Sequence, residues 1–172
     1  MLQEVDSGLL QKREGLYLLF FFEKGLIMFT IVFYIFSSFL AFLDYKKFLI
    51  PNNILLAMSV MLITFGLLES KIYISSIILS LLVLLFFVVI LLLNRTQILG
   101  GGDIKYMMVI ALYLGVKPFA VFLVVTGLVQ TFALLYKQML MKRRVAPMAP
   151  AMFISVAIVD MMIYFKIYPS LF

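Results

Sequence analysis

Residues 72–93 read IYISSIILSLLVLLFFVVILLL and contain no charged side chain. A stretch of this kind is typical of a transmembrane helix, which needs about 20 apolar residues to cross a bilayer. The 172-residue chain as a whole is 66% hydrophobic and 13% charged, with a mean hydropathy of +1.20. Too little polar surface remains to cover a soluble globule. The sequence therefore predicts an all-α, polytopic helix bundle that is embedded in lipid.

The apolar stretches predict a single membrane-embedded domain over residues 1–172, because about six spans joined by short loops use up the chain. Residues 1–24 mix acidic and basic side chains around an apolar patch. This mixture predicts a polar or interfacial segment rather than a cleaved signal peptide. The expected spans are about 25–43, 54–68, 72–93, 104–114, 119–136 and 151–165.

Composition excludes several kinds of chemistry. The chain contains no histidine and no cysteine, so it cannot form disulfides, a Cys or His zinc site, a thiol nucleophile or a Ser-His-Asp triad. Its net charge of +6 does not predict nucleic-acid binding, because the basic residues lie mainly in short loops between expected spans. We expect the lipid bilayer as a partner and no cofactor or metal.

The loops between the spans differ in their content of basic residues. The first, third and fifth loops carry Lys46, Lys47, Arg95, Lys105, Lys137, Lys142, Arg143 and Arg144. The second and fourth loops carry only Lys71 and Lys117. The positive-inside rule therefore predicts that the richer set faces the cytoplasm and that both termini lie outside. Asp44, at the end of the first span, and Asp103, at the start of the fourth, then fall at one membrane face.

Each of these two aspartates has a simple interpretation and a catalytic one. Asp44 can be an ordinary charged helix end, and Asp103 can cap the helix that it begins. Together they can share one proton and activate a water molecule, which is the clearest route to peptide hydrolysis in a chain without a triad or metal site. From the helix dipoles we expect Asp103 to ionise first, as the resting base, and Asp44 to hold the proton.

Three motifs of the sequence resemble those of the prepilin peptidase family, the bacterial GxGD-type intramembrane aspartic proteases. Residues 44–52, DYKKFLIPN, resemble the family's first aspartate with its basic residues and Ile-Pro-Asn. Residues 100–105, GGGDIK, resemble the GxGD motif, and residues 111–115, ALYLG, resemble the segment after it. Residues 147–150, PMAP, resemble the proline pair that opens the last span.

The resemblance implies an aspartic endopeptidase whose catalytic residues are Asp44 and Asp103. It also implies that the substrates are type IV prepilin-like proteins, cut at the cytoplasmic face of the bacterial inner membrane between a short basic leader and a hydrophobic helix. Larger family members carry paired CxxC motifs and methylate the new N-terminus, whereas this chain has no cysteine. It is therefore similar to the short, peptidase-only form of tight-adherence and Flp pilus systems.

Residues around the pair are expected to support substrate binding. Gly100, Gly101 and Gly102 lack side chains, so an extended substrate backbone could approach Asp103 there. Pro51 and Asn52 are expected to stop the preceding loop and cap the second helix. Lys105 either orients substrate or anchors its helix to lipid headgroups.

Asp160 is the remaining acid within an expected span. It lies ten residues after Pro150, which corresponds to a depth of roughly 15 Å in a helix. We expect it to form a buried hydrogen bond inside the bundle and not to take part in catalysis.

Two alternatives from other functional classes remain. A small transporter or proton-coupled channel could use the acids as ion relays, although a relay should place acids at successive depths. A purely structural assembly factor of a secretion machine is the other alternative.

Overall fold

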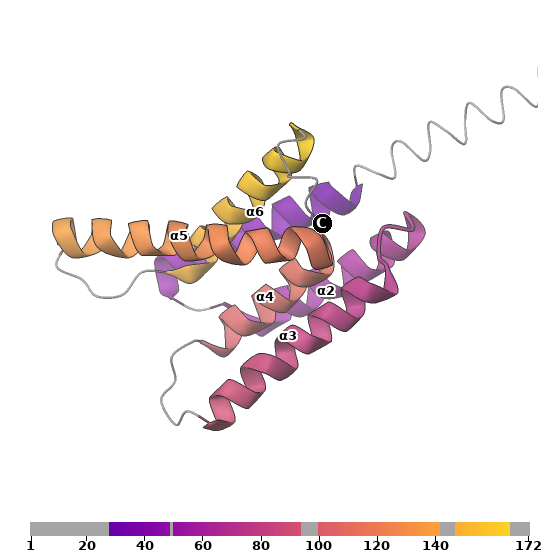
Figure 1. Ribbon diagram of the computed structural model, residues 1–172, viewed down its shortest axis with the longest axis horizontal. Coiled ribbons are helices and arrows are strands. Elements are labelled where there is room, and N and C mark those ends of the chain that lie inside the picture. Colours follow the sequence, from indigo (N-terminus) through magenta and orange to yellow (C-terminus); the bar gives the residue numbers. More distant parts are fainter. Residues whose placement is uncertain (1–27, 49, 94–99, 142–146, 166–172) are drawn as a thin grey trace, which may run out of the picture.

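The computed structural model describes residues 28–48, 50–93, 100–141 and 147–165, and within these ranges it is helical without strands. A first helix, Met28–Lys47, precedes α2 (Asn52–Leu68) and α3 (Ile74–Leu93). Then follow α4 (Gly101–Leu114), α5 (Val116–Met141) and α6 (Met148–Tyr164) (Figure 1). The all-α prediction is confirmed. The interfacial segment expected at residues 1–24 lies outside the described residues.

Most helices extend beyond the apolar spans from which they were predicted. Helices α4, α5 and α6 each begin about three residues earlier than expected, and their first turns contain Gly102, Pro118 and Pro150. The first turn of a helix does not need its own backbone N–H groups paired within the helix, so glycine and proline are tolerated there. Hydropathy alone misses these turns because it detects only the apolar middle of each helix.

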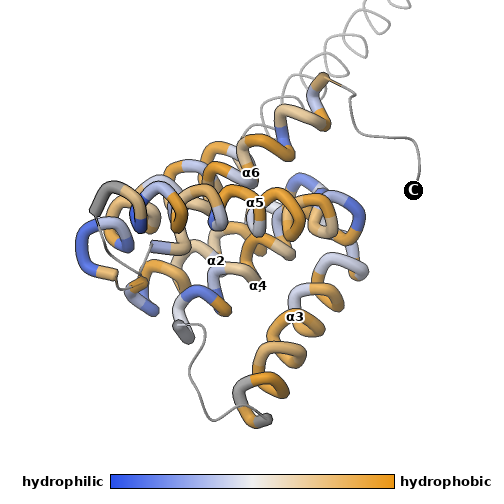
Figure 2. The backbone as a smooth tube through the Cα atoms, turned by 60° about the vertical axis from the view of Figure 1, so that its left-hand side comes forward, coloured by the Kyte–Doolittle hydropathy of each residue, from blue (hydrophilic) through white to orange (hydrophobic). Residues whose placement is uncertain are grey.

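The outer surface of the bundle is apolar. Two helices, Met28–Lys47 and Val116–Met139, are long and apolar enough to cross a membrane, and three further apolar helices are shorter. Large hydrophobic side chains point outward, such as Ile74 and Leu92 of α3, each 78% exposed. Figure 2 shows α3 coloured as hydrophobic along most of its length. These features match a membrane protein, whose outer side chains face lipid.

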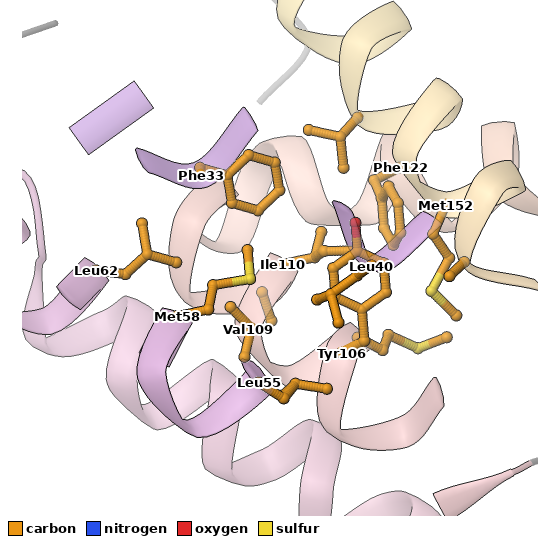
Figure 3. Close-up of a cluster of buried hydrophobic side chains, with 14 of the residues drawn as sticks. Phe33, Leu40, Leu55, Met58, Leu62, Tyr106, Val109, Ile110, Phe122 and Met152 are labelled. Carbon is orange, nitrogen blue, oxygen red and sulfur yellow. The ribbon is translucent and has the colours of Figure 1, made fainter. Parts of the chain in front are cut away.

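Helix α4 lies at the centre of the bundle and packs against α2, α3, α5 and α6. Figure 1 shows α3 running beside it. Figure 3 shows the α4 residues Tyr106, Val109 and Ile110 among side chains from the first helix, α2, α5 and α6. Asp103 therefore stands at one end of the best-packed helix.

A single residue, Gly115, joins α4 to α5. Its φ of 74° lies in the left-handed region, and its N–H bonds to the carbonyl oxygen of Ala111 at 3.0 Å. A side chain there would be strained, and its Cβ would lie 3.3 Å from Ser76 Oγ of α3. Glycine thus allows α4 to stop and α5 to begin without a loop.

Candidate active site

Asp44 connects the first helix to α6. It lies in the last turn of Met28–Lys47 and is only 5% exposed. The backbone N–H of Ala149, in the first turn of α6, donates a hydrogen bond of 2.9 Å to Asp44 Oδ2. The N–H groups of a first turn have no partner within their own helix, so a carboxylate from another helix satisfies one of them.

The chain turns sharply after Asp44. Phe48 N–H bonds to the carbonyl oxygen of Asp44 at 2.9 Å, and Phe48 adopts a φ of 50°. This left-handed residue ends the helix in the way that glycine often does. After the turn the chain reaches Ile50, whose side chain is buried and only 8% exposed. Asp44 is therefore inside the helix and not in the loop expected after residue 43.

Gly102 lets α4 approach this turn closely. A Cβ built on Gly102 would lie 2.9 Å from Ile50 Cβ, closer than side-chain atoms normally approach. A Cβ on Gly101 would meet nothing within 4 Å. The glycine run therefore has two different surroundings. Gly102 is needed for packing against Ile50, and Gly101 leaves open space of the kind expected for an approaching substrate backbone.

Asp103 occupies the first turn of α4, just ahead of the apolar span 104–114, and is half-buried. Its pKa is raised from 3.8 to about 6, first by burial and then by the negative charge of Asp44, while a hydrogen bond from the Gly100 backbone acts in the opposite direction. Asp44 and Asp103 thus lie close enough for one charge to act on the other. Such a pair retains a proton more readily than isolated carboxylates do.

The raised pKa of Asp103 contradicts the expectation that this carboxyl group ionises readily. The helix dipole predicted that Asp103 would ionise first, but burial and the charge of Asp44 outweigh that effect. Asp44 instead faces the N-terminus of α6 and accepts the Ala149 N–H. Neither the raised pKa of Asp103 nor the Ala149 contact of Asp44 could be derived from the local positions of the two residues at the ends of their helices.

Asn52 and Lys105 make a contact that the sequence did not predict. Pro51 is the N-cap residue of α2 and makes no side-chain capping bond, and Asn52 is already the first helical residue, so the expected capping by Asn52 is wrong. Instead Lys105 Nζ donates a hydrogen bond of 3.0 Å to Asn52 Oδ1. This long-range bond links α4 to the start of α2.

Asp160 lies away from the pair and makes two hydrogen bonds. The hydroxyls of Tyr34 and Tyr113 donate to Asp160 Oδ2 at 2.7 and 3.0 Å. The prediction of a hydrogen bond inside the bundle is confirmed. Sequence analysis missed both tyrosines, although each is a polar side chain within an apolar helix. Among the described residues, no group of three or more His, Cys, Asp or Glu side chains could hold a metal ion.

Comparison with known proteins gives one family. A model of the type IV leader peptidase family matches residues 31–135, more than half of the chain. The matched range includes Asp44 and Asp103 and ends within α5. No curated protein and no solved structure matches the chain.

Proposed function

We propose that this chain, which belongs to the type IV leader peptidase family, hydrolyses peptide bonds with Asp44 and Asp103 as its catalytic carboxylates. The observation that carries the proposal is the electrostatic effect of Asp44, which together with burial raises the pKa of Asp103 to about 6. The pair can then hold one proton close to neutral pH. Aspartic proteolysis requires one carboxylate and one carboxylic acid at the same time.

The geometry supports a division of roles within the pair. Asp44 accepts the Ala149 N–H at Oδ2 and acts as the base that takes a proton from the attacking water. Asp103 holds the shared proton and gives it to the carbonyl oxygen of the scissile bond. Asp44 then gives the proton that it took from water to the leaving nitrogen, one diol hydroxyl returns its proton to Asp103, and the C–N bond breaks to release the amine and a carboxylic acid. Assigned in this way, each proton has a donor and an acceptor within the site.

The proposed substrates are type IV prepilin-like proteins, cut between a short basic leader and an apolar helix. The site lies at helix ends and not in the middle of the bundle, which fits a leader in water and a helix in lipid. Lys46 and Lys47 follow Asp44 directly and are exposed. Lys105 follows Asp103 and is exposed too. These basic residues support a cytoplasmic active site in a multi-pass protein of the bacterial inner membrane.

We also propose that the chain cleaves its substrates without methylating them. The sequence has no cysteine, so it cannot supply the paired CxxC motifs of the larger, methylating family members. Incubation of the protein with a cleaved substrate and a methyl donor, followed by mass spectrometry of the new N-terminus, tests this part. Addition of about 14 Da, the mass that one methyl group adds, would contradict this part of the proposal.

Co-expression with a candidate prepilin tests the main proposal. We expect a leader-sized mobility shift with the unaltered chain and no shift with Asp44→Asn or Asp103→Asn. Asp160→Asn serves as the matched control, because it changes the same functional group away from the pair and should retain cleavage. A shift that persists in both mutants of the pair would rule out the aspartic mechanism.

A further inference from the structure

Polar side chains connect three helices at a second level, away from the proposed catalytic pair. Tyr34 of the first helix and Tyr113 of α4 both donate to Asp160 Oδ2 of α6. The same three helices carry Asp44, Asp103 and Ala149 at the other level. We call Tyr34, Tyr113 and Asp160 the tyrosine clamp.

The spacing between the two levels is nearly the same on every helix. Ten residues separate Tyr34 from Asp44 and Asp103 from Tyr113, and eleven separate Ala149 from Asp160. At 1.5 Å per residue, each interval is about 15 to 17 Å. The three helices are therefore held at two matched depths, once beside the catalytic carboxylates and once at the clamp.

Aromatic packing fixes where the clamp hydroxyls lie. The Tyr113 ring stacks on Phe33 with a centroid distance of 3.9 Å and an interplanar angle of 7°. The Tyr34 ring meets Phe153 of α6 edge to face at 5.9 Å. With both rings held in this way, the two hydroxyls converge on a single carboxylate oxygen, and a displaced α6 could not keep both bonds.

The remainder of the inner face of α6 has few features that would fix its position. Its buried residues are small or apolar, namely Ala149, Ala151, Met152, Ser155, Val156 and Val159. The Ser155 hydroxyl bonds to Ala151 within the same helix. Burial of apolar side chains gives little preference for one helix position in lipid, because the lipid tails are equally apolar. Directional hydrogen bonds therefore act together with side-chain packing in defining how far α6 slides or turns.

We propose that the tyrosine clamp positions the catalytic carboxylates by fixing the register of α6, and hence the Ala149 N–H that holds Asp44. This inference rests on the proposed function, in which Asp44 is the base. Asp160, Tyr34 and Tyr113 are positioning residues and do not touch the substrate. Because displacement of a reacting group by about 1 Å can cost 10²-fold in rate, loss of the clamp should slow cleavage.

The test compares two substitutions of Asp160 in the full chain reconstituted in lipid nanodiscs. Asp160→Asn keeps an oxygen that can accept both hydroxyls, whereas Asp160→Leu removes the acceptor. The substrate is a synthetic peptide with a short basic leader ending in glycine, followed by an apolar helix. We expect Asp160→Leu to lower kcat by about 10- to 100-fold with little change in KM, and Asp160→Asn to retain kcat within about 3-fold.

A second measurement follows α6 without any cleavage. The chain lacks cysteine, so nitroxide labels can be attached to cysteines introduced at Phe39 and Ile154, which are 50% and 48% exposed. Electron–electron double resonance then gives the distance between the first helix and α6. We expect Asp160→Leu to shift or broaden this distance distribution and Asp160→Asn to preserve it. Failure of the proposed function would show as absent cleavage in the unaltered chain, with the label distances still responding to Asp160→Leu.

Tyrosine variants cover the case in which Asp160→Leu does not fold. Tyr34→Phe and Tyr113→Phe retain the rings and each remove one clamp bond, so the double variant should disturb the label distance. Tyr106→Phe is the matched control on α4, since the buried Tyr106 hydroxyl is not one of the two donors to Asp160 and the distance should not change. Unchanged distance and kcat in the variants lacking the clamp would overturn the proposal. So would a fall in kcat without a change in distance, or equal damage from Asp160→Asn and Asp160→Leu.

Discussion

Carboxylates join helices at two levels of this bundle, and their surroundings differ. Asp160 accepts two tyrosine hydroxyls through one oxygen. Asp44 accepts one backbone N–H, and its charge acts on a second carboxylate, Asp103. A carboxylate whose donors are all supplied by the protein is suited to structure. Two carboxylates that oppose each other's ionisation are suited to proton transfer, because one of them readily keeps a proton near neutral pH.

The largest expected effect distinguishes a catalytic role of Asp44 from a purely structural one. Asp44→Asn should lower kcat at least about 10²-fold, because an amide cannot take a proton from water. Its oxygen can still accept the Ala149 N–H, so thermal unfolding in detergent should change little. Asp44→Leu should lose the same activity and also about 1 to 3 kcal/mol of stability, because a buried N–H is left unpaired. Rapid cleavage by Asp44→Asn would show that Asp44 serves only to hold α6.

Two neighbouring glycines test how the pair is brought together. Gly102→Ala places a Cβ against Ile50 and should cost about 1 to 3 kcal/mol of stability, with at least a 10-fold loss of cleavage. Gly101→Ala is the matched control for stability, because its Cβ meets no atom within 4 Å. Thermal unfolding and initial cleavage rates measure both effects. A stable but inactive Gly101→Ala would indicate that substrate passes over this glycine, and equal destabilisation by the two changes would contradict the packing argument.

The pH dependence of cleavage and of the Asp103 pKa tests the electrostatic interaction between Asp44 and Asp103. The pKa of Asp103 is raised to about 6 by burial and by Asp44, so removal of that charge in Asp44→Asn should lower the pKa of Asp103. Asp160→Asn should leave it unchanged. If protonated Asp103 is the acid, cleavage should decline as pH rises above about 6. Infrared titration of the carboxyl band measures the pKa of Asp103 in both variants, with Asp103→Asn as the control that assigns the band. A pKa of Asp103 that does not respond to Asp44→Asn would refute the coupling.

The smallest effect concerns the contact between Lys105 and Asn52. Lys105 is exposed, so loss of its 3.0 Å hydrogen bond in Lys105→Met should cost no more than about 1 kcal/mol. Asn52→Ala removes the same bond from the other side, and the two losses should not add in the double variant. Chemical denaturation and KM give the two readouts. A rise in KM with Lys105→Met alone would assign Lys105 to substrate binding and not to holding α2.

The helices were predictable from the sequence, and so was the position of Asp103 at the start of its helix, because both depend on local composition. It was also predictable that Asp160 is hydrogen-bonded, since an acid within an apolar helix needs a partner. The identity of the partners was not predictable. Tyr34 and Tyr113 are 126 and 47 residues away from Asp160, and their meeting depends on how the helices are rotated.

Two of the differences between expectation and structure have the same physical origin. Capping by Asn52 and early ionisation of Asp103 were both inferred from the local position of each residue at a helix terminus. Long-range contacts decide both cases, through Lys105 for Asn52 and through Asp44 and burial for Asp103. Local rules describe what a side chain can do in an isolated helix, and the bundle selects among those possibilities.

Gly115 has a mechanical consequence. With one residue between them, α4 and α5 are two arms on a shared pivot, and at 1.5 Å per residue their lengths are about 21 and 39 Å. Asp103 stands near the tip of the short arm, and Met139, 84% exposed, stands near the tip of the long one. If both arms turned together about this pivot, an excursion of Asp103 would be magnified nearly twofold at Met139. A spectroscopic label at Met139 would then report small movements of the Asp103 carboxyl group as larger displacements.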